Sequence, residues 1–581
     1  MRETLWRQLL RTMSSERQRL NGWMECVGVV LLCEFVPPNL ALDAMLMTKR
    51  KRIYFDGFLP PAKLNTRLKR LESQTRQSID YYNAHPIPCR APSKNQTTSI
   101  SIFTSQSPRP ALTSLPAPPF LVPAILEALI KSEYYKIITE VVPGEADLYC
   151  ARYLKKHGGT VFTGDSDLLV HELGMNGAVA FFKDIEDPNT SSGSLQSRIY
   201  HSAAIAERLG LPKSPGLLSL AFEMFMDNHG TFPKLVAQAS TLKAIKTHEK
   251  MYQNFCKEYA SLDGGVEETS DITPVLSVLR SLDPRISEVV LQFPAIGTLA
   301  RQETAAATQN TPHVFLPFLL DCPIRTSTWE MSTSVRQLAY GLINLIVPES
   351  QQRFSIYEHR RQQKNSSGRE WQLPSISEIP DACTAVANLL KLLRDKLPKT
   401  SEVDLWLAIA IYQDIERASS LDKTPLSRAI TDQLFDLQDP RRYYKNCSWD
   451  VIHLLAQIQG SYYSFRILKQ IINLLIAHNG SRLLPEPVRQ LNNHLESLPG
   501  FCDILDLSHV TSIYQRIQSN NILKMAHEIV GIEEPEAIGY VETSVSSSSK
   551  KKQKRKGASV TTESSALKKK STNPFELLGQ E

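Results

Sequence analysis

Cysteine is sparse in this 581-residue chain, and its spacing excludes two common kinds of site. The nine cysteines are an odd number and form no CxxC pair or other zinc-ligand spacing. A disulfide framework and a zinc finger are therefore not expected. The chain also lacks a P-loop, a dinucleotide fingerprint and a Ser/His/Asp triad. We interpret lone histidines such as His157 and His171 as ordinary residues without a catalytic role.

Long hydrophobic runs are also missing. The longest early run, at 26–33, lies between Glu25 and Glu34 and is too short to span a bilayer. A secretory signal is a weaker interpretation, because acids precede the run and no small-residue cleavage site follows before Pro37. We therefore expect an intracellular protein without a membrane span.

Positive charge is scarce outside the C-terminal end. Residues 541–581 hold nine Lys/Arg against four acids, so they carry +5 of the formal net charge of +6. The remaining +1 excludes a uniformly basic wrapper of nucleic acid, and any affinity for polyanions must be local. The lysine clusters at 550–556 and 568–570 predict a nuclear-localisation signal or a polyanion anchor, with a solubilising tail as the plainer alternative.

Composition divides the chain into three regions. Residues 1–230 alternate strand-like and helix-like patterns, with a Pro/Ser-rich insertion at about 86–123 that is expected to be flexible. Residues 231–540 show helical patterns without convincing strand alternation, and 541–581 form a basic tail expected to be disordered. The segment from Asn573 to Gly579 is apolar again, as in a short motif that docks a protein partner.

The first region predicts strands that are followed by turns or helices. The predicted strands are residues 52–55, 135–142, 160–163 and 178–182. Helices are predicted after Pro60-Pro61 and at 145–156. A strand, a helix and a second strand in about 30 residues indicate a βαβ crossover, and thus an α/β fold with a mostly parallel sheet.

Carboxylates follow three of these strands. Asp56 follows the first, Glu145 and Asp147 follow the second, and Asp165 and Asp167 follow the third. The C-terminal ends of parallel strands meet at one edge, where crowded carboxylates repel one another unless cations neutralise them. All-oxygen ligands suit Mg²⁺ or Mn²⁺ rather than zinc, and such ions support phosphodiester hydrolysis.

Each acidic segment also has a plainer interpretation. Asp56-Gly57 is typical of a turn, and acids such as Glu145 and Asp147 are favoured in the first turn of any helix. The sequence GDSD at 164–167 is compatible with a loop that carries a helix cap. These interpretations do not explain why all three segments fall at successive strand ends.

Two of the segments resemble one nuclease superfamily. The sequence VPGEAD at 142–147, followed by Asp165-Ser166-Asp167, resembles the internal motif of flap-endonuclease/XPG-type nucleases. The sequence YFDGFLPP at 54–61 resembles the end of their N-terminal motif. With VRQLAYG at 335–341, it is similar to the asteroid family, an XPG-related branch with a long helical C-terminal region. The resemblance covers 52–72 and 135–172, extends more loosely to about 230, and implies a PIN/FEN-like core with helices on both faces of its sheet.

The resemblance also implies roles for individual residues. The positions that match metal-binding carboxylates of the superfamily are Asp56, Glu145, Asp147, Asp165 and Asp167, with Asp227 at the place of a further one. Lys63 and Arg70 match basic side chains that face the scissile phosphate, and their spacing places them on one helix face. The alternative for this pair is a solvated basic face shared with Arg67 and Lys69.

The N-terminus departs from the superfamily pattern. Residue 2 is Arg where the superfamily has Gly, and no apolar strand closing on Asp-Gly or Asp-Ala precedes residue 48, where Leu42-Asp43-Ala44 is the only candidate. Either the first acid is missing, or the N-terminus is not the family's own. The glycine-rich helix–two-turn–helix that grips duplex DNA is also absent, since HGTFPK at 229–234 lacks the repeated glycine. Duplex tracking is therefore expected to be weak or to be achieved differently.

The sequence therefore predicts a nuclear, metal-dependent nuclease that cuts structured or single-stranded DNA more readily than RNA. The alternative is a catalytically degenerate scaffold with a nuclease fold that binds nucleic acid or protein partners. The missing first acid favours this alternative, and the five retained acids oppose it. A third and weaker hypothesis is a signalling or chromatin adaptor without nucleic-acid contact.

Overall fold

The computed structural model describes most of the chain, within a compact unit that ends at Glu534. The described residues are 29–33, 51–87, 119–185, 197–257, 259, 273–301, 311–361, 368–435, 448–480, 483–506 and 509–532. Most of the predicted insertion at 86–123 and all of the predicted tail at 541–581 lie outside them. Within the described residues, no helix has the length and apolar character needed to cross a membrane.

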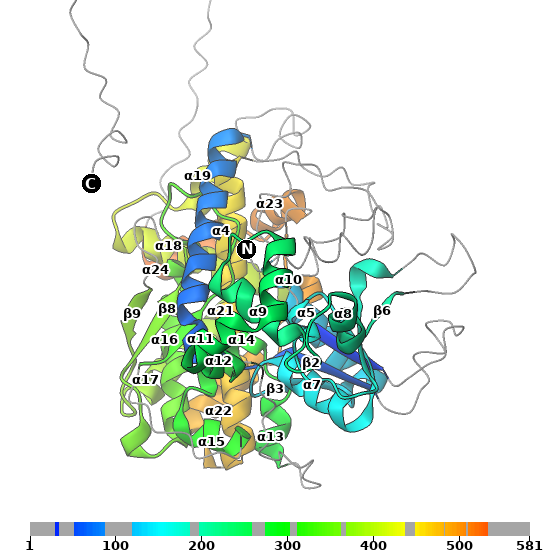
Figure 1. Cartoon of the computed structure of the whole chain (residues 1–581). Helices are drawn as coiled ribbons and strands as arrows, with labels where there is room; N and C mark the ends of the chain where they lie inside the picture. Colours follow the sequence, from blue (N-terminus) through cyan, green and yellow to red (C-terminus); the bar gives the residue numbers. More distant parts are fainter. Residues whose placement is uncertain are drawn as a thin grey trace, which may run out of the picture. The chain divides into compact units, whose positions relative to one another are not determined.

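A six-stranded sheet organises the N-terminal region (Figure 1). Its strands, in spatial order, are β3 (Thr139–Val142), β2 (Lys51–Asp56), β1 (Val29–Cys33), β4 (Gly159–Thr163), β5 (Gly177–Phe181) and β6 (Ile199–Tyr200). β2 is parallel to β3, and β4 is parallel to β5. Since β1 is antiparallel to both β2 and β4, the strands β2, β3, β4 and β5 all run in one direction. The predicted α/β fold class and the common direction of the four predicted strands are confirmed.

The middle of the sheet differs from the prediction. The apolar run at 26–33, which we considered only as too short for a membrane span, supplies β1. β1 pairs antiparallel on both sides, and β6 pairs antiparallel with β5, so the sheet is mixed. In the register, Val29 lies opposite Phe55 and Cys33 lies opposite Lys51. The C-terminal end of β1 therefore lies at the opposite edge of the sheet from the end of β2.

Helices cover both faces of this sheet. On β2, Ile53 and Phe55 pack on one face against α5 (Leu121–Lys131). Tyr54 lies on the other face and packs with the core formed by α7 (Ala146–His157). This alternation follows from the two-residue period of a strand, and it buries both faces as an α/β architecture requires.

Two predicted boundaries shift. The strand expected at 135–142 begins only at Thr139, because α6 (Glu133–Lys136) precedes it. Ser132 Oγ accepts a hydrogen bond from the backbone N–H of Tyr135 at 3.4 Å and caps this short helix. The helix expected at 145–156 is α7, which has Glu145 as its N-cap residue.

The helix predicted after Pro60-Pro61 consists of two elements. They are the short 3-10 helix η1 (Pro61–Lys63) and α4 (Leu64–Ala84). The far end of α4 packs against the first residue of α21 (Trp449–Asn479), where the ring centroids of Tyr82 and Trp449 are 5.1 Å apart. Trp449 Nε1 also donates a hydrogen bond to the carbonyl oxygen of His85 at 2.9 Å.

Many helices follow the first part of the sheet (Figure 1). Those nearest the sheet in sequence are η3 (Asp167–Leu169), η4 (Phe182–Asp184), α8 (Ser202–Arg208), α9 (Leu217–Met226), α10 (Phe232–Thr241), α11 (Lys243–Thr247) and α12 (Glu249–Cys256). The later ones are α13 (Pro274–Leu279), α14 (Pro284–Val290), α15 (Pro294–Arg301), η5 (Thr328–Ser332), α16 (Thr333–Leu342), η6 (Ile343–Ile346), η7 (Glu349–Gln351), α17 (Ile379–Lys396), α18 (Glu402–Ser420), α19 (Leu426–Phe435), α21 (Trp449–Asn479), α22 (Glu486–Leu495), η9 (Phe501–Asp503), α23 (Val510–Ser519) and α24 (Ile522–Val530).

The expectation of no strands after residue 231 is wrong. A three-stranded sheet lies within the helical region, formed by β7 (His313–Phe315), β8 (Ser355–His359) and β9 (Arg369–Gln372). β7 and β8 are parallel, and β8 and β9 are antiparallel. These strands have only three to five residues each, too few for a convincing alternation in the sequence.

A buried ion pair joins this small sheet to the helices. Arg336 of α16 is fully buried and donates to both carboxylate oxygens of Glu358 of β8, at 2.6 and 2.9 Å. Tyr340 Oη donates to the same carboxylate at 3.2 Å, and the Arg336 Nη1 donates to Ser332 and Ser464 at 3.0 Å. The VRQLAYG segment at 335–341 thus has a clear packing role.

Arg336→Ala tests the dependence of the helical region on this pair. We expect the free energy of unfolding to fall by about 3–5 kcal/mol, because the variant leaves Glu358 buried without its main partner. The double variant Arg336→Met/Glu358→Met should lose less, since it leaves neither charge of the pair buried alone. Urea denaturation followed by circular dichroism measures both, and equal losses would contradict this account.

Candidate active site

The ends of three strands bring five acids together. Asp56 is the last residue of β2, Glu145 and Asp147 follow β3, and Asp165 and Asp167 follow β4. Burial first, and then the four neighbouring carboxylates, raise the pKa of Asp147 well above its ordinary value. The structure therefore places all five in one electrostatic cluster, called here the acidic cluster.

Asp56 is the best-defined member of the acidic cluster. Its Oδ1 accepts a hydrogen bond from the backbone N–H of Ala146, the first residue of α7, at 2.7 Å. Burial raises the pKa of Asp56 to about 6, although this hydrogen bond and the charge of Lys63 lower it. The N-terminus of α7 thus stabilises the ionised carboxylate of Asp56, but ionising this buried group still costs free energy without further cations.

Gly57 is required by the close packing behind Asp56. A Cβ at this position would come within 2.8 Å of Ser287 Oγ, and closer still to the carbonyl oxygen of Val142. Asp56-Gly57 therefore does more than form a turn, because α14 and the end of β3 press against the chain at Gly57.

The segment after β4 has a local role as well. The backbone N–H of Asp165 donates to Thr163 Oγ1 at 2.9 Å, and the N–H of Asp167 donates to Asp165 Oδ1 at 3.0 Å. The latter bond lies within the loop before η3, whose N-cap residue Ser166 forms no side-chain cap hydrogen bond. Asp165 and Asp167 also add to the effect of burial on the pKa of Asp147.

Lys63 is the cation that the structure places among these acids. Its ammonium group forms an ion pair with Glu145. Burial lowers the pKa of Lys63, but Glu145 together with Asp147 and Asp167 outweighs this and raises it. Lys63 therefore stays protonated at neutral pH and partly balances the acidic cluster.

Two arginines of α4 differ in their surroundings: Arg67 is bound to another helix, and Arg70 is exposed. Arg67 forms a two-pronged ion pair with Glu288 of α14, and its guanidinium lies 3.8 Å from the centroid of the Phe315 ring. It is mostly buried, so a solvated position for Arg67 is wrong. Arg70 is exposed, one turn further along the stripe of Lys63 and Arg67. No ion pair of Arg70 is found among the described residues.

Asp227 has a partner of its own. It lies at the C-terminal end of α9, and Lys234 Nζ donates to its Oδ2 at 2.9 Å. The hydrogen bond from Lys234 is the main reason why the pKa of Asp227 is lowered. The side chain is 37% exposed, which gives it a more open setting than Asp56.

His171 borders the site, although the sequence gave no reason to single it out. It is buried, and burial followed by the charge of Lys63 lowers its pKa to about 4. The ring is therefore neutral at pH 7. Its ring centroid lies 5.2 Å from that of Tyr259.

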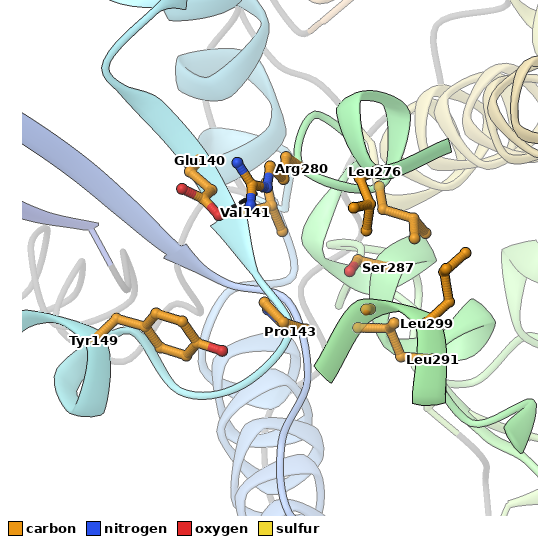
Figure 2. Close-up of a pocket in the computed structure, with 11 residues that line it drawn as sticks. Glu140, Val141, Pro143, Tyr149, Leu276, Arg280, Ser287, Leu291 and Leu299 are labelled. Atoms are coloured by element: carbon orange, nitrogen blue, oxygen red, sulfur yellow. Dashed lines mark ion pairs between the residues drawn. The ribbon is translucent and has the colours of Figure 1, made fainter. Parts of the chain in front are cut away.

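A mainly apolar cleft lies beside the site (Figure 2). β3 and α7 form one wall, and α13, α14 and α15 form the other. An ion pair of 3.2 Å between Arg280 and Glu140 crosses it, and the backbone N–H of Val141 donates to the carbonyl oxygen of Arg280 at 2.8 Å. None of the five acids lines this cleft, so it is a neighbour of the acidic cluster rather than part of it.

The chemistry of the acidic cluster fits a hard divalent cation. The side chains offer only carboxylate oxygens, and burial, followed by their mutual repulsion, raises the pKa of both Asp56 and Asp147. As the side chains stand in the described residues, no three of His, Cys, Asp or Glu are grouped closely enough to hold a metal ion. The acidic cluster therefore matches a divalent cation in its negative charge and in its oxygen donors.

Asp56→Asn tests the cost of this charge in metal-free solution. An unfolded Asp56 ionises near its ordinary pKa of 3.8, whereas the folded group stays protonated up to about pH 6. The folded parent thus loses stability as pH rises from about 4 to about 6. The variant keeps the acceptor for Ala146 and cannot ionise. In EDTA it should be more stable than the parent by about 3 kcal/mol at pH 7 and no more stable near pH 4. Thermal unfolding measures this, and an equal difference at both pH values would contradict it.

One comparison with known proteins identifies the family of this region. Residues 117–373 match a family model described as "XPG domain containing". The matched segment holds Glu145, Asp147, Asp165, Asp167 and Asp227, whereas Asp56, Lys63 and Arg70 precede it. Comparisons with curated proteins and with solved structures gave no match. This segment is therefore similar to the XPG-type family, and the α/β fold of the chain is consistent with that similarity.

Proposed function

We propose that this protein is a metal-dependent nuclease that hydrolyses phosphodiester bonds in structured or single-stranded nucleic acid, DNA in preference to RNA. The acidic cluster carries the proposal, because carboxylates from three strand ends share one electrostatic environment. Four of its five acids lie in the segment that matches the XPG-type family model.

The acidic cluster is the proposed metal site. The residues that would hold Mg²⁺ or Mn²⁺ are Asp56, Glu145, Asp147, Asp165 and Asp167. When bound there, such an ion supplies charge neutralisation and activates water for attack on a phosphodiester. Asp227 would join this site only by leaving Lys234, because that lysine now holds its carboxylate.

Lys63, the N-cap residue of α4, and Arg70 within α4 are proposed to hold the scissile phosphate. Lys63 is protonated and already lies against Glu145 at the border of the acidic cluster. Arg70 is exposed on the same stripe of the helix, and its guanidinium suits a phosphate oxygen. Arg67 is a positioning residue, since its bond to Glu288 fixes the helix that carries both groups.

The narrower assignments are proposals of the same kind. The YFDGFLPP segment at 54–61 supports membership in the asteroid branch, and the lysine clusters of the tail support a nuclear location. The VRQLAYG segment at 335–341 supports the asteroid assignment only as a packing feature of the helical region, because Arg336 and Tyr340 are buried there.

A second candidate function is favoured by the direction of β1. A strand antiparallel to β2 and β4 ends at the far edge of the sheet, so its C-terminal end adds no acid to the acidic cluster. A scaffold that has lost catalysis, and that binds nucleic acid or protein partners, is consistent with this arrangement.

Asp165→Ala/Asp167→Ala separates the two functions. The parent should cleave flap, bubble or splayed oligonucleotides with Mg²⁺ or Mn²⁺, and the double variant should lose at least about 100-fold in rate because two proposed ligands are gone. Asp381→Ala/Asp395→Ala, on exposed positions of α17, is the matched control and should cleave like the parent.

Two results would overturn the nuclease proposal. One is cleavage that persists unchanged in Asp165→Ala/Asp167→Ala. The other is a parent that binds oligonucleotides in EDTA, shows no Mn²⁺ binding by calorimetry and cleaves none of the substrates. The second result would support the scaffold.

A further inference from the structure

Three arginines converge on one carboxylate in the helical region. Glu330 of η5 accepts a hydrogen bond from Arg360 Nη2 at 2.8 Å and another from Arg369 Nη1 at 3.0 Å. Arg417 forms an ion pair with the same carboxylate at 3.5 Å. The three guanidinium groups come from the residue after β8, from β9 and from α18, so distant parts of the sequence share one anion. These four residues are called here the arginine cluster.

The charges around the arginine cluster are not balanced. The other nearby carboxylate is that of Glu358, whose Oε2 is 4.0 Å from Arg360 Nη1. Arg336 already donates to both oxygens of this carboxylate. Among the described residues, no further acid forms an ion pair with any of these arginines. Four arginines therefore face two glutamates, which leaves a formal charge of +2.

The acids next to these arginines in sequence are engaged elsewhere. Tyr357 Oη donates to Glu370 Oε2 at 3.2 Å, and the alternation of a strand places Glu370 on the opposite face of β9 from Arg369. Tyr412 Oη donates to Glu416 Oε1 at 2.9 Å within α18. These two acids therefore do not neutralise the arginine cluster.

The most buried arginine of the cluster also lacks acceptors. The Arg360 side chain is 1% exposed, and its Nη1 atom has no hydrogen-bond partner among the described residues. The indole N–H of Trp371 is likewise buried without an acceptor in this part of the chain, and its ring centroid lies 5.5 Å from Arg360 Cζ. Burial is the main reason why the pKa of Arg360 is lowered. A buried guanidinium with incomplete compensation favours the binding of a further anion.

The other two arginines make the cluster accessible to solvent. The side chain of Arg369 is 53% exposed and that of Arg417 is 46% exposed. Arg369 is held in place by Trp371, because its Cζ lies 4.1 Å from the centroid of that ring. In the hydrogen bonds and ion pairs of the described residues, Arg369 uses only Nη1 and Arg417 only Nη2. Each guanidinium therefore keeps donors for an incoming anion.

We propose that the arginine cluster binds a phosphate dianion, carried by a small phosphomonoester. Guanidinium groups match phosphate oxygens in geometry and charge, and a dianion balances the excess of +2. Arg369 and Arg417 contact the phosphate, and Arg360 adds its buried charge. This site goes beyond the proposed function, because it shares no residue with the acidic cluster and needs neither metal nor cleavage.

The test titrates methyl phosphate and dimethyl phosphate into the full chain by calorimetry, in EDTA at about pH 8. A phosphomonoester has a second pKa of about 6 and is a dianion under these conditions, whereas the diester carries one charge, like a nucleic-acid backbone. Methyl phosphate should bind at least about tenfold more tightly. Equal affinities would indicate a nucleic-acid backbone contact and overturn the proposal. So would a parent that does not bind methyl phosphate.

Arg369→Gln/Arg417→Gln removes the two accessible guanidinium groups. The affinity for methyl phosphate should fall at least about tenfold. Arg76→Gln/Arg489→Gln is the matched control, since it removes two exposed arginines that each pair with a single acid. The control should bind within about twofold of the parent, and circular dichroism verifies that both double variants are folded. Equal affinities of the two variants would contradict the assignment of the site.

Glu330→Gln should change the affinity in the opposite direction. The variant keeps an oxygen acceptor for Arg360 but removes the negative charge that competes with phosphate, so methyl phosphate should bind at least about fivefold more tightly. If Glu330 and its arginines only joined η5, β9 and α18, the variant would lose stability without any gain in affinity, and that result would also overturn the proposal. None of these measurements depends on whether the protein is a nuclease.

Discussion

The shared direction of four strands is the constraint on which the rest of the site depends. β2, β3, β4 and β5 end at one edge of the sheet even though β1 separates β2 from β4 and runs against both. Two reversals of direction cancel, so the acids after β2 and β4 still meet. Any arrangement that reversed only one of these strands would send Asp56 or Asp165 to the far edge and divide the acidic cluster.

The cost of gathering these acids is balanced by groups drawn from distant parts of the chain. The N-terminus of α7 meets Asp56, and Lys63 meets Glu145. Neither contact is strong enough to restore an ordinary pKa to Asp56. The remaining imbalance is the reason why a hard cation is the proposed ligand of the acidic cluster. The neighbouring cleft in Figure 2 differs, because its Glu140 carboxylate is paired with Arg280.

The sequence predicted those parts of the fold that depend on short-range patterns. The end of β2 at Asp56 and the start of α7 after Glu145 follow from turn and cap signals a few residues long, and their common edge follows from the βαβ order. Their role as metal ligands remains a prediction. The direction of β1 could not be predicted, because its five residues are compatible with pairing in either sense.

Long-range partners were also beyond the sequence. Nothing local to Arg67 indicates that it binds Glu288, which is 221 positions away, and a basic helix face looked equally suitable for solvent. Asp227 illustrates the converse case. Its place in the superfamily pattern suggested a metal ligand, whereas only the packing of α9 against α10 reveals the competing ammonium group of Lys234.

α4 gives the molecule a mechanical property. Its 21 residues, at about 1.5 Å each, make a rigid rod about 30 Å long. One end lies beside Glu145, the first turn is held by Glu288 through Arg67, and the far end rests on Trp449. Glu288 and Trp449 both belong to the helical region, so a shift of α14 or of the first turn of α21 would move the rod whose N-cap residue is Lys63.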